Sequence, residues 1–419
     1  MAQSLSELYE RALARSESYL SAQVEVRQAR ANLRIRAGQA WPTVSATIGA
    51  NFTAQPRIDG LLDRSPDQSP SLSLDRSLGL SVHQPLFQFG RHDAELKRDE
   101  LLVQVAWLRL AKTQGIVQRE LALAYLSANA GAALMEAQDA QAESLLALLR
   151  QTRERFDAGY SPMNAVLAAE VDYRQSLINM TKARQRASQA QRRLNRLTYL
   201  PDTQVLEGEI AHIDAHFPRD RDEAILFALE NNIDVLIART RVRAARAGLW
   251  ATARSNLPSL SWSASHSRSI GNTQMFDRPH LNDNGISDIR RQNSGFGVQV
   301  SIPIFQGGIQ REQRANAQDQ VSMALRDLNL TRENLQADLF EQWATIEQEQ
   351  EILVQWRQLI ALEEQKLSNA ETLLDQGYLT LDEIQSAYLR LHQLQNEVLT
   401  TQHAIHIAQF EILAAMGVL

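Results

Sequence analysis

Four stretches of the chain alternate between apolar and polar residues. In the first, about residues 42–52, valine, alanine, isoleucine and phenylalanine fill the even positions from 44 to 52, and small polar residues and glycine fill most of the odd ones. The other three stretches are about 72–88, 258–268 and 294–305. A period of two with one apolar face is typical of half-buried strands, because successive side chains point to opposite faces. The pattern predicts four strands in two pairs.

Two long proline-free segments follow the strand pairs, from Arg91 to Asp157 and from Gln310 to Gln376. An uninterrupted helix of that length would measure roughly 100 Å at about 1.5 Å per residue. In the second segment the apolar residues recur in steps of three, four and seven, which is a coiled-coil-like seam. These residues are Leu325, Leu328, Leu335, Leu339, Trp343, Ile346, Leu353, Trp356 and Ile360.

The helical pattern predicts three helices in each half of the chain. The long helices should cover about 91–158 and 309–376, and each is followed by a turn and a helix, about 162–199 and 380–416. A further helix precedes each strand pair, roughly over Leu5 to Gly38 and over Asp222 to Asn256.

The chain is predicted to be a tandem duplication of this unit. QPLFQFG at 84–90 is nearly repeated as IPIFQGG at 302–308, and Pro85 and Pro303 differ by 303 − 85 = 218 positions. Gly159 and Gly377 share that offset, and VRQARANL at 26–33 returns as VRAARAGL at 242–249. We place the boundary in the segment 197–220, which contains two prolines, so that the repeats cover 1–214 and 215–419.

The strand pairs favour a membrane barrel over an ordinary soluble sheet that covers a core. Each alternating run is close to the length with which a tilted strand crosses a bilayer. The opposite face is small and hydrophilic, which suits a wet lumen, and the polar loops expected at 53–70 and 268–294 are long. Four strands cannot close a barrel, and an open edge in lipid would leave backbone groups unsatisfied. We therefore expect oligomerisation, and three copies would supply twelve strands.

The repeated heptapeptides are predicted to be strand-to-helix junctions, where a strand leaves the membrane. Proline ends the ladder of backbone hydrogen bonds, and glycine permits the bend. The junction residues are Pro85, Gly90, Pro303, Gly307 and Gly308.

Composition narrows the function classes. There are no cysteines, which excludes thiolate metal sites, thiol nucleophiles, disulfides and a lipid-modified N-terminal cysteine. Two histidine pairs have helical spacing, His212 with His216 and His403 with His406, but neither has an obvious third ligand, so we expect no metal and no cofactor. A formal net charge of -6 gives no reason to expect nucleic acid.

No chemistry-bearing cluster emerges from the sequence. There is no phosphate-cradling glycine loop and no Ser/His/Asp set above chance, so we expect no enzyme, and energy must come from a partner. No apolar run approaches the roughly 20 residues of a transmembrane helix. The start, MAQSLSELYERAL, lacks the features of a signal peptide, so the protein is either not exported or numbered from near a mature terminus.

The order of these motifs resembles the TolC family of outer-membrane efflux and secretion channels, in its unlipidated branch. The resemblance rests on the duplicated plan, on the two junctions, on the turns FDAGYSP and LDQGYLT, and on the closing AQFEILAAMGVL. It implies a homotrimer with a twelve-stranded barrel in the outer membrane of a Gram-negative bacterium and a helical tunnel through the periplasm. It also implies a periplasmic adaptor (membrane fusion) protein and an inner-membrane transporter of ABC or RND type. Cargo would be small toxic compounds or type I secreted proteins.

The resemblance also assigns the two glycine turns to a periplasmic tip where the adaptor docks. The tip turns are Gly159, Tyr160 and Ser161, and Gly377, Tyr378 and Leu379. Acidic residues after the second turn would ring the aperture, and the candidates are Asp382 and Glu383, with Asp157, Asn164 and Asp375 nearby.

Two alternatives remain open at this stage. Asp382 and Glu383 are also the acids expected in the first turn of any helix. Leu379 and Ser386 stand where a basic and a second acidic partner would complete a charged gate. For the whole chain, the alternative is a structural coiled-coil rod or scaffold without a transport role, which would stay soluble without detergent.

Overall fold

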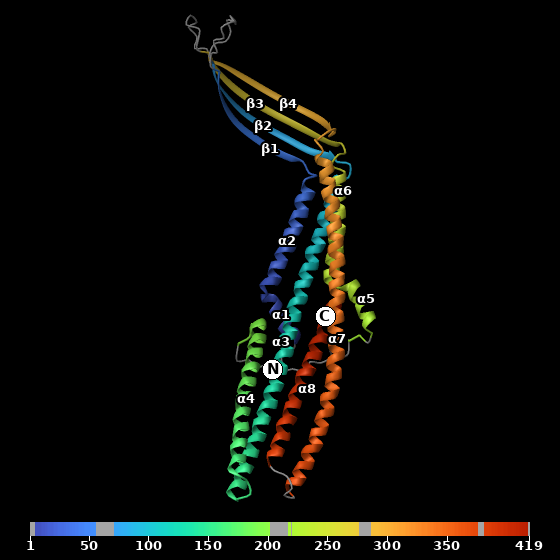
Figure 1. Ribbon diagram of the computed structural model, residues 1–419. Coiled ribbons are helices and arrows are strands. Elements are labelled where there is room, and N and C mark those ends of the chain that lie inside the picture. Colours follow the sequence, from blue (N-terminus) through green and yellow to red (C-terminus); the bar gives the residue numbers. More distant parts are fainter. Residues whose placement is uncertain are drawn as a thin grey trace, which may run out of the picture. The chain divides into compact units, whose positions relative to one another are not determined.

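The computed structural model describes residues 5–55, 71–201, 217–218, 220–275, 286–375 and 381–417 (Figure 1). These residues form two compact units, and each unit takes segments from both halves of the sequence. The first comprises the chain up to Val26, Val105–Arg239 and Arg326 onward. The second comprises Arg27–Gln104 and Thr240–Leu325. The expected boundary between the repeats, at 214/215, lies outside the described residues.

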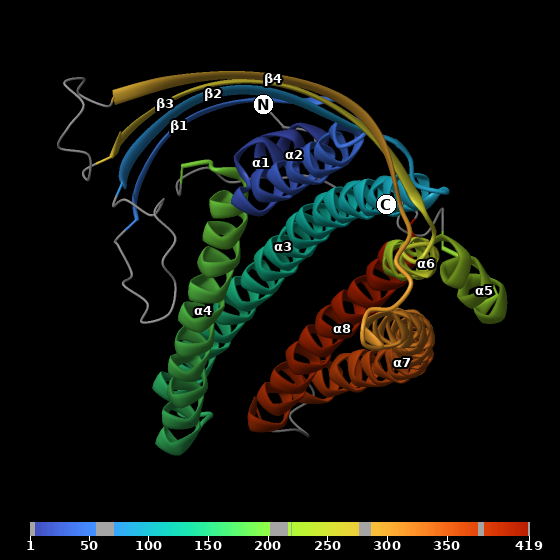
Figure 2. The same ribbon diagram turned by 90° about the horizontal axis from the view of Figure 1, so that it is seen from above.

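The second unit contains one antiparallel sheet with the strand order β1-β2-β3-β4. Its strands are β1 (Thr43–Gln55), β2 (Ser71–Phe87), β3 (Ser259–Met275) and β4 (Ile286–Ser301). The sheet is curved, as Figure 2 shows from above. All four predicted strands are therefore present, and the pairing of β2 with β3 joins the two repeats.

Both ends of β4 and the far end of β3 differ from the prediction. β3 continues to Met275, and β4 begins at Ile286. Residues expected in the long polar loop 268–294 are therefore paired in the ladder. Alternation stops there while backbone hydrogen bonding goes on, because the ladder requires no apolar face. At its other end β4 stops at Ser301 rather than at 305. Pro303, which follows, has no N–H to donate to a ladder.

The long helices are present as predicted. Helices α3 (Arg91–Asp157) and α7 (Ile309–Asp375) have 67 residues each. Each is followed by a shorter helix, α4 (Met163–Thr198) after α3 and α8 (Leu381–Met416) after α7. Among the described helices, none is both long enough and apolar enough to cross a membrane.

The seam predicted along α7 faces the packed interior in most of its length. Leu328, Leu339 and Ile346 are buried. Leu335 and Trp343 pack against the core cluster that contains Leu339 and Ile346. The rings of Trp343 and Phe217 stack there, with 5.2 Å between their centroids. Leu325 is the exception, because it is exposed in the chain.

The core of the first unit repeats itself at the offset of the duplication. One cluster is built around Leu121 of α3 and the other around Leu339 of α7, and 339 − 121 = 218. Other buried side chains obey the same offset: Ala128 and Ile346, Leu194 and Ile412, Thr198 and Met416. The duplication is therefore visible in the packing as well as in the sequence.

The single helix expected at the start of each half is broken in two. Ser16 separates α1 (Leu5–Arg15) from α2 (Glu17–Gly38), and Asn232 separates α5 (Arg221–Asn231) from α6 (Ile233–Ala253). The Oδ1 atom of Asn232 accepts from the backbone N–H of Asp234 at 2.9 Å, and Ser16 Oγ accepts from that of Tyr19. Both breaks are thus N-caps, which satisfy backbone donors at the start of the next helix.

Candidate functional site

The sheet has one apolar and one polar face, and the register keeps each face continuous across all four strands. The row Val44, Val82, Ala264 and Phe296 is apolar from edge to edge. The neighbouring row is Ser45, Ser81, Ser265 and Gly295, with 2.7 Å between the hydroxyl oxygens of Ser45 and Ser81.

Most side chains of the apolar face are exposed within the residues that the structure describes. Ile48 is 87% exposed and Phe296 75% exposed, and Val44, Phe52, Leu78 and Val300 are exposed too. A soluble sheet that covers a core would bury these side chains, since burial of apolar area is what stabilises such a sheet. An exposed apolar face of this size marks an interaction with lipid or with another chain.

The two junctions bend the backbone in the same way. Gly307 and Gly308 have φ of 59° and 81°, and the residues at the same offset in the first repeat, Phe89 and Gly90, have φ of 50° and 77°. Positive φ favours glycine, and a phenylalanine there is strained. Of the two predicted prolines, Pro303 lies between β4 and α7. Pro85 lies inside β2, where the pairing with β3 becomes irregular between Pro85 and Phe87.

The predicted aperture residues all lie at helix ends. Asp157 ends α3 and Asn164 lies in the first turn of α4, and both are exposed. Asp375 ends α7, and Asp382 and Glu383 lie in the first turn of α8, where Glu383 is exposed. A position in the first turn also fits the helix-dipole role of an acid, so both interpretations of Asp382 and Glu383 remain.

Of the two predicted tip turns, the structure describes only the first. Gly159 has φ of 80°, Tyr160 is 85% exposed, and Ser161 is half-buried. Gly377, Tyr378 and Leu379 lie outside the described residues. We use the word tip for the connected ends of α3 with α4 and of α7 with α8.

Near the tip, one hydrogen bond joins the two helix pairs. Gln385 of α8, which is 4% exposed, donates from Nε2 to the carboxylate of Asp172 on α4. Leu389, one turn further along α8, packs with Tyr173 against the buried Leu145 and Leu148 of α3. We call the Asp172–Gln385 bond with this apolar contact the α4–α8 link. It holds α8 against α3 and α4.

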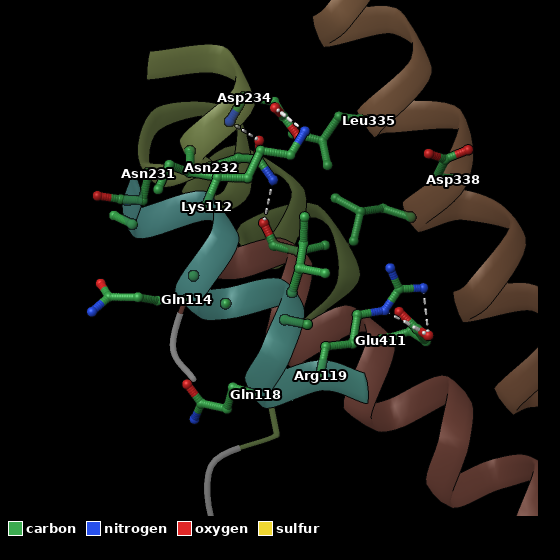
Figure 3. A pocket seen from close by; sticks show the side chains of 18 of the residues that line it. Lys112, Gln114, Gln118, Arg119, Asn231, Asn232, Asp234, Leu335, Asp338 and Glu411 are labelled. Atoms are coloured by element: carbon green, nitrogen blue, oxygen red, sulfur yellow. Dashed lines mark hydrogen bonds and ion pairs between the residues drawn. The ribbon is translucent and has the colours of Figure 1, made fainter. Parts of the chain in front are cut away.

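A groove of about 850 Å³ lies further along the same unit, between α3, α6, α7 and α8 (Figure 3). Two ion pairs cross it, Lys112 Nζ with Asp234 at 2.6 Å and Arg119 with Glu411 at 2.7 Å. Asp338 of α7 adds a carboxylate to the lining (Figure 3). Lys112 and Arg119, the cations that line the groove, are both paired with carboxylates of the chain. This pairing indicates that the groove is a packing junction between helices.

Two histidines of α8 are partly buried, and their surroundings favour the neutral ring. Burial lowers the pKa of His392. Burial lowers the pKa of His403 as well, and the neighbouring His406 lowers it further. His212 and His216, the other predicted pair, lie outside the described residues.

Sequence reasoning missed the α4–α8 link and the two N-caps. Ser16 and Asn232 each precede a helical run with polar capping chemistry, so their signal was present in the sequence. Asp172 and Gln385 are 213 residues apart. Nothing in the local pattern identifies them as partners.

A family described as "Outer membrane efflux protein" matches residues 8–198 and 225–418. The chain is similar to TolC of Escherichia coli K12, at 24% identity over 67% of this chain and 57% of that protein. It is also similar to the outer membrane efflux protein BepC of Brucella suis, at 22% identity over 88% of this chain and 78% of that one. The match thus spans less than two thirds of the Escherichia coli relative's length.

Solved structures share the fold over nearly the whole chain. The outer membrane protein VceC of Vibrio cholerae superposes with a TM-score of 0.79 at 18% identity, covering 99% of this chain and 96% of that one. CusC gives a TM-score of 0.80 at 16% identity, covering 98% and 91%. The open-state MtrE channel of Neisseria gonorrhoeae gives 0.70 at 17% identity, covering 99% and 88%.

Proposed function

The chain belongs to the outer membrane efflux protein family, and from this premise we propose that it forms a passive exit duct through which cargo leaves the cell. The duct would be a homotrimer, with a barrel in the outer membrane and a helical tunnel in the periplasm. The alternative of a soluble rod is not supported, because the family match covers both halves of the chain.

The observation that carries this proposal is the uncovered apolar face of the sheet. Its side chains stay exposed in the single chain, while the opposite face carries serine, threonine, glycine and other polar residues. In a barrel the first face would meet lipid and the second a water-filled lumen. One sheet would then satisfy both environments.

The sheet's edges support assembly from several chains. In the described residues β1 and β4 each pair on one side only. Unpaired backbone groups in lipid cost several kcal/mol each, so this sheet must close with strands of other copies. Three copies would give twelve strands, with β4 of one copy against β1 of the next.

Opening would take place at the tip. The turns Gly159–Ser161 and Gly377–Leu379 would receive a periplasmic adaptor, and Asp157, Asn164, Asp375, Asp382 and Glu383 would surround the aperture. The α4–α8 link is positioned to hold the two helix pairs together. Adaptor binding would separate α8 from α4 and widen the aperture, by sliding or untwisting of the helices.

The energy for export would come from an inner-membrane transporter of ABC or RND type that works with the adaptor. One relative, BepC, is named an outer membrane efflux protein, and one solved structure is described as the open state of a channel. Cargo would accordingly be small toxic compounds or secreted polypeptides.

The test is export of the chain behind a cleavable signal sequence, followed by membrane fractionation and unheated gel mobility. We expect a detergent-dependent trimer in the outer-membrane fraction that conducts ions in planar bilayers. A soluble monomer or dimer would overturn the duct. A trimer without conductance would leave the assembly intact and overturn the transport role.

A further inference from the structure

The outward, even-numbered face of the sheet changes character along β3 and β4. Beyond Ala264 and Phe296 the next rows contain His266 with Ser294 and then Arg268 with Gln292. One row further, Arg290 stands opposite Ile270, which in turn stands opposite Arg76 of β2. Arg76, Arg268 and Arg290 therefore share the face whose other end is apolar. We call these three residues the basic cluster.

The register brings the three arginines close together. Arg76 and Arg290 occupy one row with a single strand between them, so their backbones lie about 10 Å apart at ~4.8 Å per strand. Arg268 sits on that intervening strand, diagonal to both, at about 7–8 Å from each. Guanidinium groups on long side chains at these spacings can reach one anion together.

The basic cluster lies at the height where the apolar band should end. From the helix-side ends of the strands, the arginines are 9 to 11 residues away: Phe87 to Arg76, Ser301 to Arg290, and Ser259 to Arg268. With a rise of ~3.3 Å per residue and a tilt of ~40°, this is roughly 25 Å along the barrel axis. The lipid-facing band of such barrels is also about 25 Å tall. The cluster thus falls at the outer headgroup level.

The end of the apolar band crosses the sheet obliquely. On β4 the last apolar side chain before the polar rows is Phe296, whereas on β2 Arg76 stands between Leu78 and Leu74, and β1 still carries Phe52 opposite Leu74. Strands in a barrel are tilted, so a plane parallel to the membrane must cross them at different register positions. Figure 1 shows the tilt of the strands, with β4 lying above β1.

The basic cluster carries positive charge that is exposed and, among the described residues, not neutralised by ion pairs. All three arginines are exposed, and within the described part of the chain none of them makes an ion pair. One acidic residue, Asp288 opposite Asn272, occupies the next row. His266 Nδ1 and Ser294 Oγ are 2.7 Å apart, so this pair continues the polar area toward the apolar band.

We propose that the basic cluster binds the phosphate groups of a phosphorylated glycolipid in the outer leaflet of the outer membrane. Arginine binds phosphate in a bidentate manner, and these bonds are strongest where water is scarce, as at a headgroup boundary. The acyl chains of the same lipid would lie along Ala264, Phe296 and Leu78. The inference rests on the barrel of the proposed function.

The test uses the purified trimer in detergent and lipid A with its two phosphates, compared with dephosphorylated lipid A of the same acyl chains. Bound lipid is counted by native mass spectrometry. We expect the wild type to bind the phosphorylated lipid about tenfold more tightly. Equal binding of both lipids by the wild type would overturn the proposal without any variant.

The matched variants are Arg290→Gln and Arg291→Gln. The two residues are adjacent, both are exposed, and the strand directs them to opposite faces. We expect Arg290→Gln, and more strongly the triple variant with Arg76→Gln and Arg268→Gln, to lose the preference for phosphate, while Arg291→Gln keeps it. Equal loss in the two single variants would contradict a lipid-facing site.

Two further arms separate the source of the phosphate and the state of the protein. Inorganic phosphate at millimolar concentration should not displace the lipid, and displacement would show a free-anion site instead. Unheated gel mobility is measured for every variant. A missing trimer in the wild type would count against the proposed function, whereas a normal trimer without lipid preference would count against this inference alone.

Discussion

Gln385 of α8 donates a hydrogen bond to Asp172 of α4, across 213 residues of sequence, and so joins the two helix pairs near the tip. Because Gln385 is almost fully buried, its amide has no easy access to water as a substitute partner. Loss of the acceptor should therefore destabilise this arrangement of α4 and α8 relative to any arrangement that exposes Gln385.

We predict that Asp172→Leu shifts the tip toward an open state. An unpaired buried amide costs about 1–3 kcal/mol, which is on the order of a tenfold shift in the equilibrium. The measurement is single-channel conductance in planar bilayers, where the open fraction should rise. Asp172→Asn is the control, since its amide oxygen can still accept. If Asp172→Leu conducts like the wild type, the link has no part in gating.

We predict that Glu383→Ala changes conductance and lowers the preference for cations. Three copies of Glu383 around one aperture would attract cations, and their removal should reduce cation selectivity by roughly twofold. Reversal potentials in a salt gradient measure this. Glu397→Ala is the control, because Glu397 is exposed on the same helix 14 residues further from the tip. Unchanged currents would remove Glu383 from the aperture and favour its role as a first-turn acid.

A third prediction concerns the two faces of the sheet. Ile48→Arg places a charge on the lipid-facing side and should destabilise the folded barrel by about 2–4 kcal/mol. Thr47→Arg is the neighbouring control on the polar face, opposite Gly79, and should cost much less. The measurement is urea unfolding from lipid vesicles. Equal destabilisation by the two variants would contradict the assignment of the faces.

Local periodicity predicted most of the fold. Alternation located all four strands, and the proline-free runs located α3 and α7 almost to the residue. The offset of 218 predicted the repeat that the packing of Leu121 and Leu339 displays. These features are encoded by neighbouring residues, which is why one sequence was enough.

The errors share a physical cause. The outer parts of β3 and β4 are mostly polar on both faces, with isolated isoleucines such as Ile270, so alternation gave no signal there, and Arg290 was counted as loop. The break at Asn232 depends on a side-chain cap and not on hydrophobicity. The Asp172–Gln385 pair depends on how α4 meets α8, and a local pattern carries no record of that contact.

The cap at Asn232 gives a fourth prediction. Its Oδ1 accepts from the N–H of Asp234, and its Nδ2 donates to the carbonyl of Ala415 at 2.9 Å. Asn232→Ala removes both bonds and should lower stability by about 1–2 kcal/mol, while Asn232→Asp keeps the cap alone and should cost less. Thermal unfolding of the purified trimer measures this. Asn231→Ala is the exposed neighbouring control, and an equal loss there would contradict a specific cap.

The last prediction is a loss of stability at mildly acidic pH. Burial lowers the pKa of His392 and His403 in the folded chain below the usual value of 6.5. Above that value both states are neutral and the histidines contribute no pH dependence. As pH falls below it, the unfolded chain takes up protons that the folded chain refuses, so the free energy of unfolding decreases until the folded pKa is passed.

His403→Leu should remove part of this dependence. Its Nε2 is buried without a hydrogen-bond partner, and its ring also hydrogen-bonds the Leu126 backbone, so an apolar side chain of similar reach should cost one hydrogen bond, roughly 1 kcal/mol, at neutral pH. We expect the midpoint of thermal unfolding to fall less steeply between pH 7 and pH 5 than in the wild type. His406→Leu should act in the same direction but more weakly, since it removes only the neighbouring charge that lowers the pKa of His403 further and leaves the burial of that ring in place. A wild type whose midpoint rises on acidification would contradict the neutral, buried assignment of these rings.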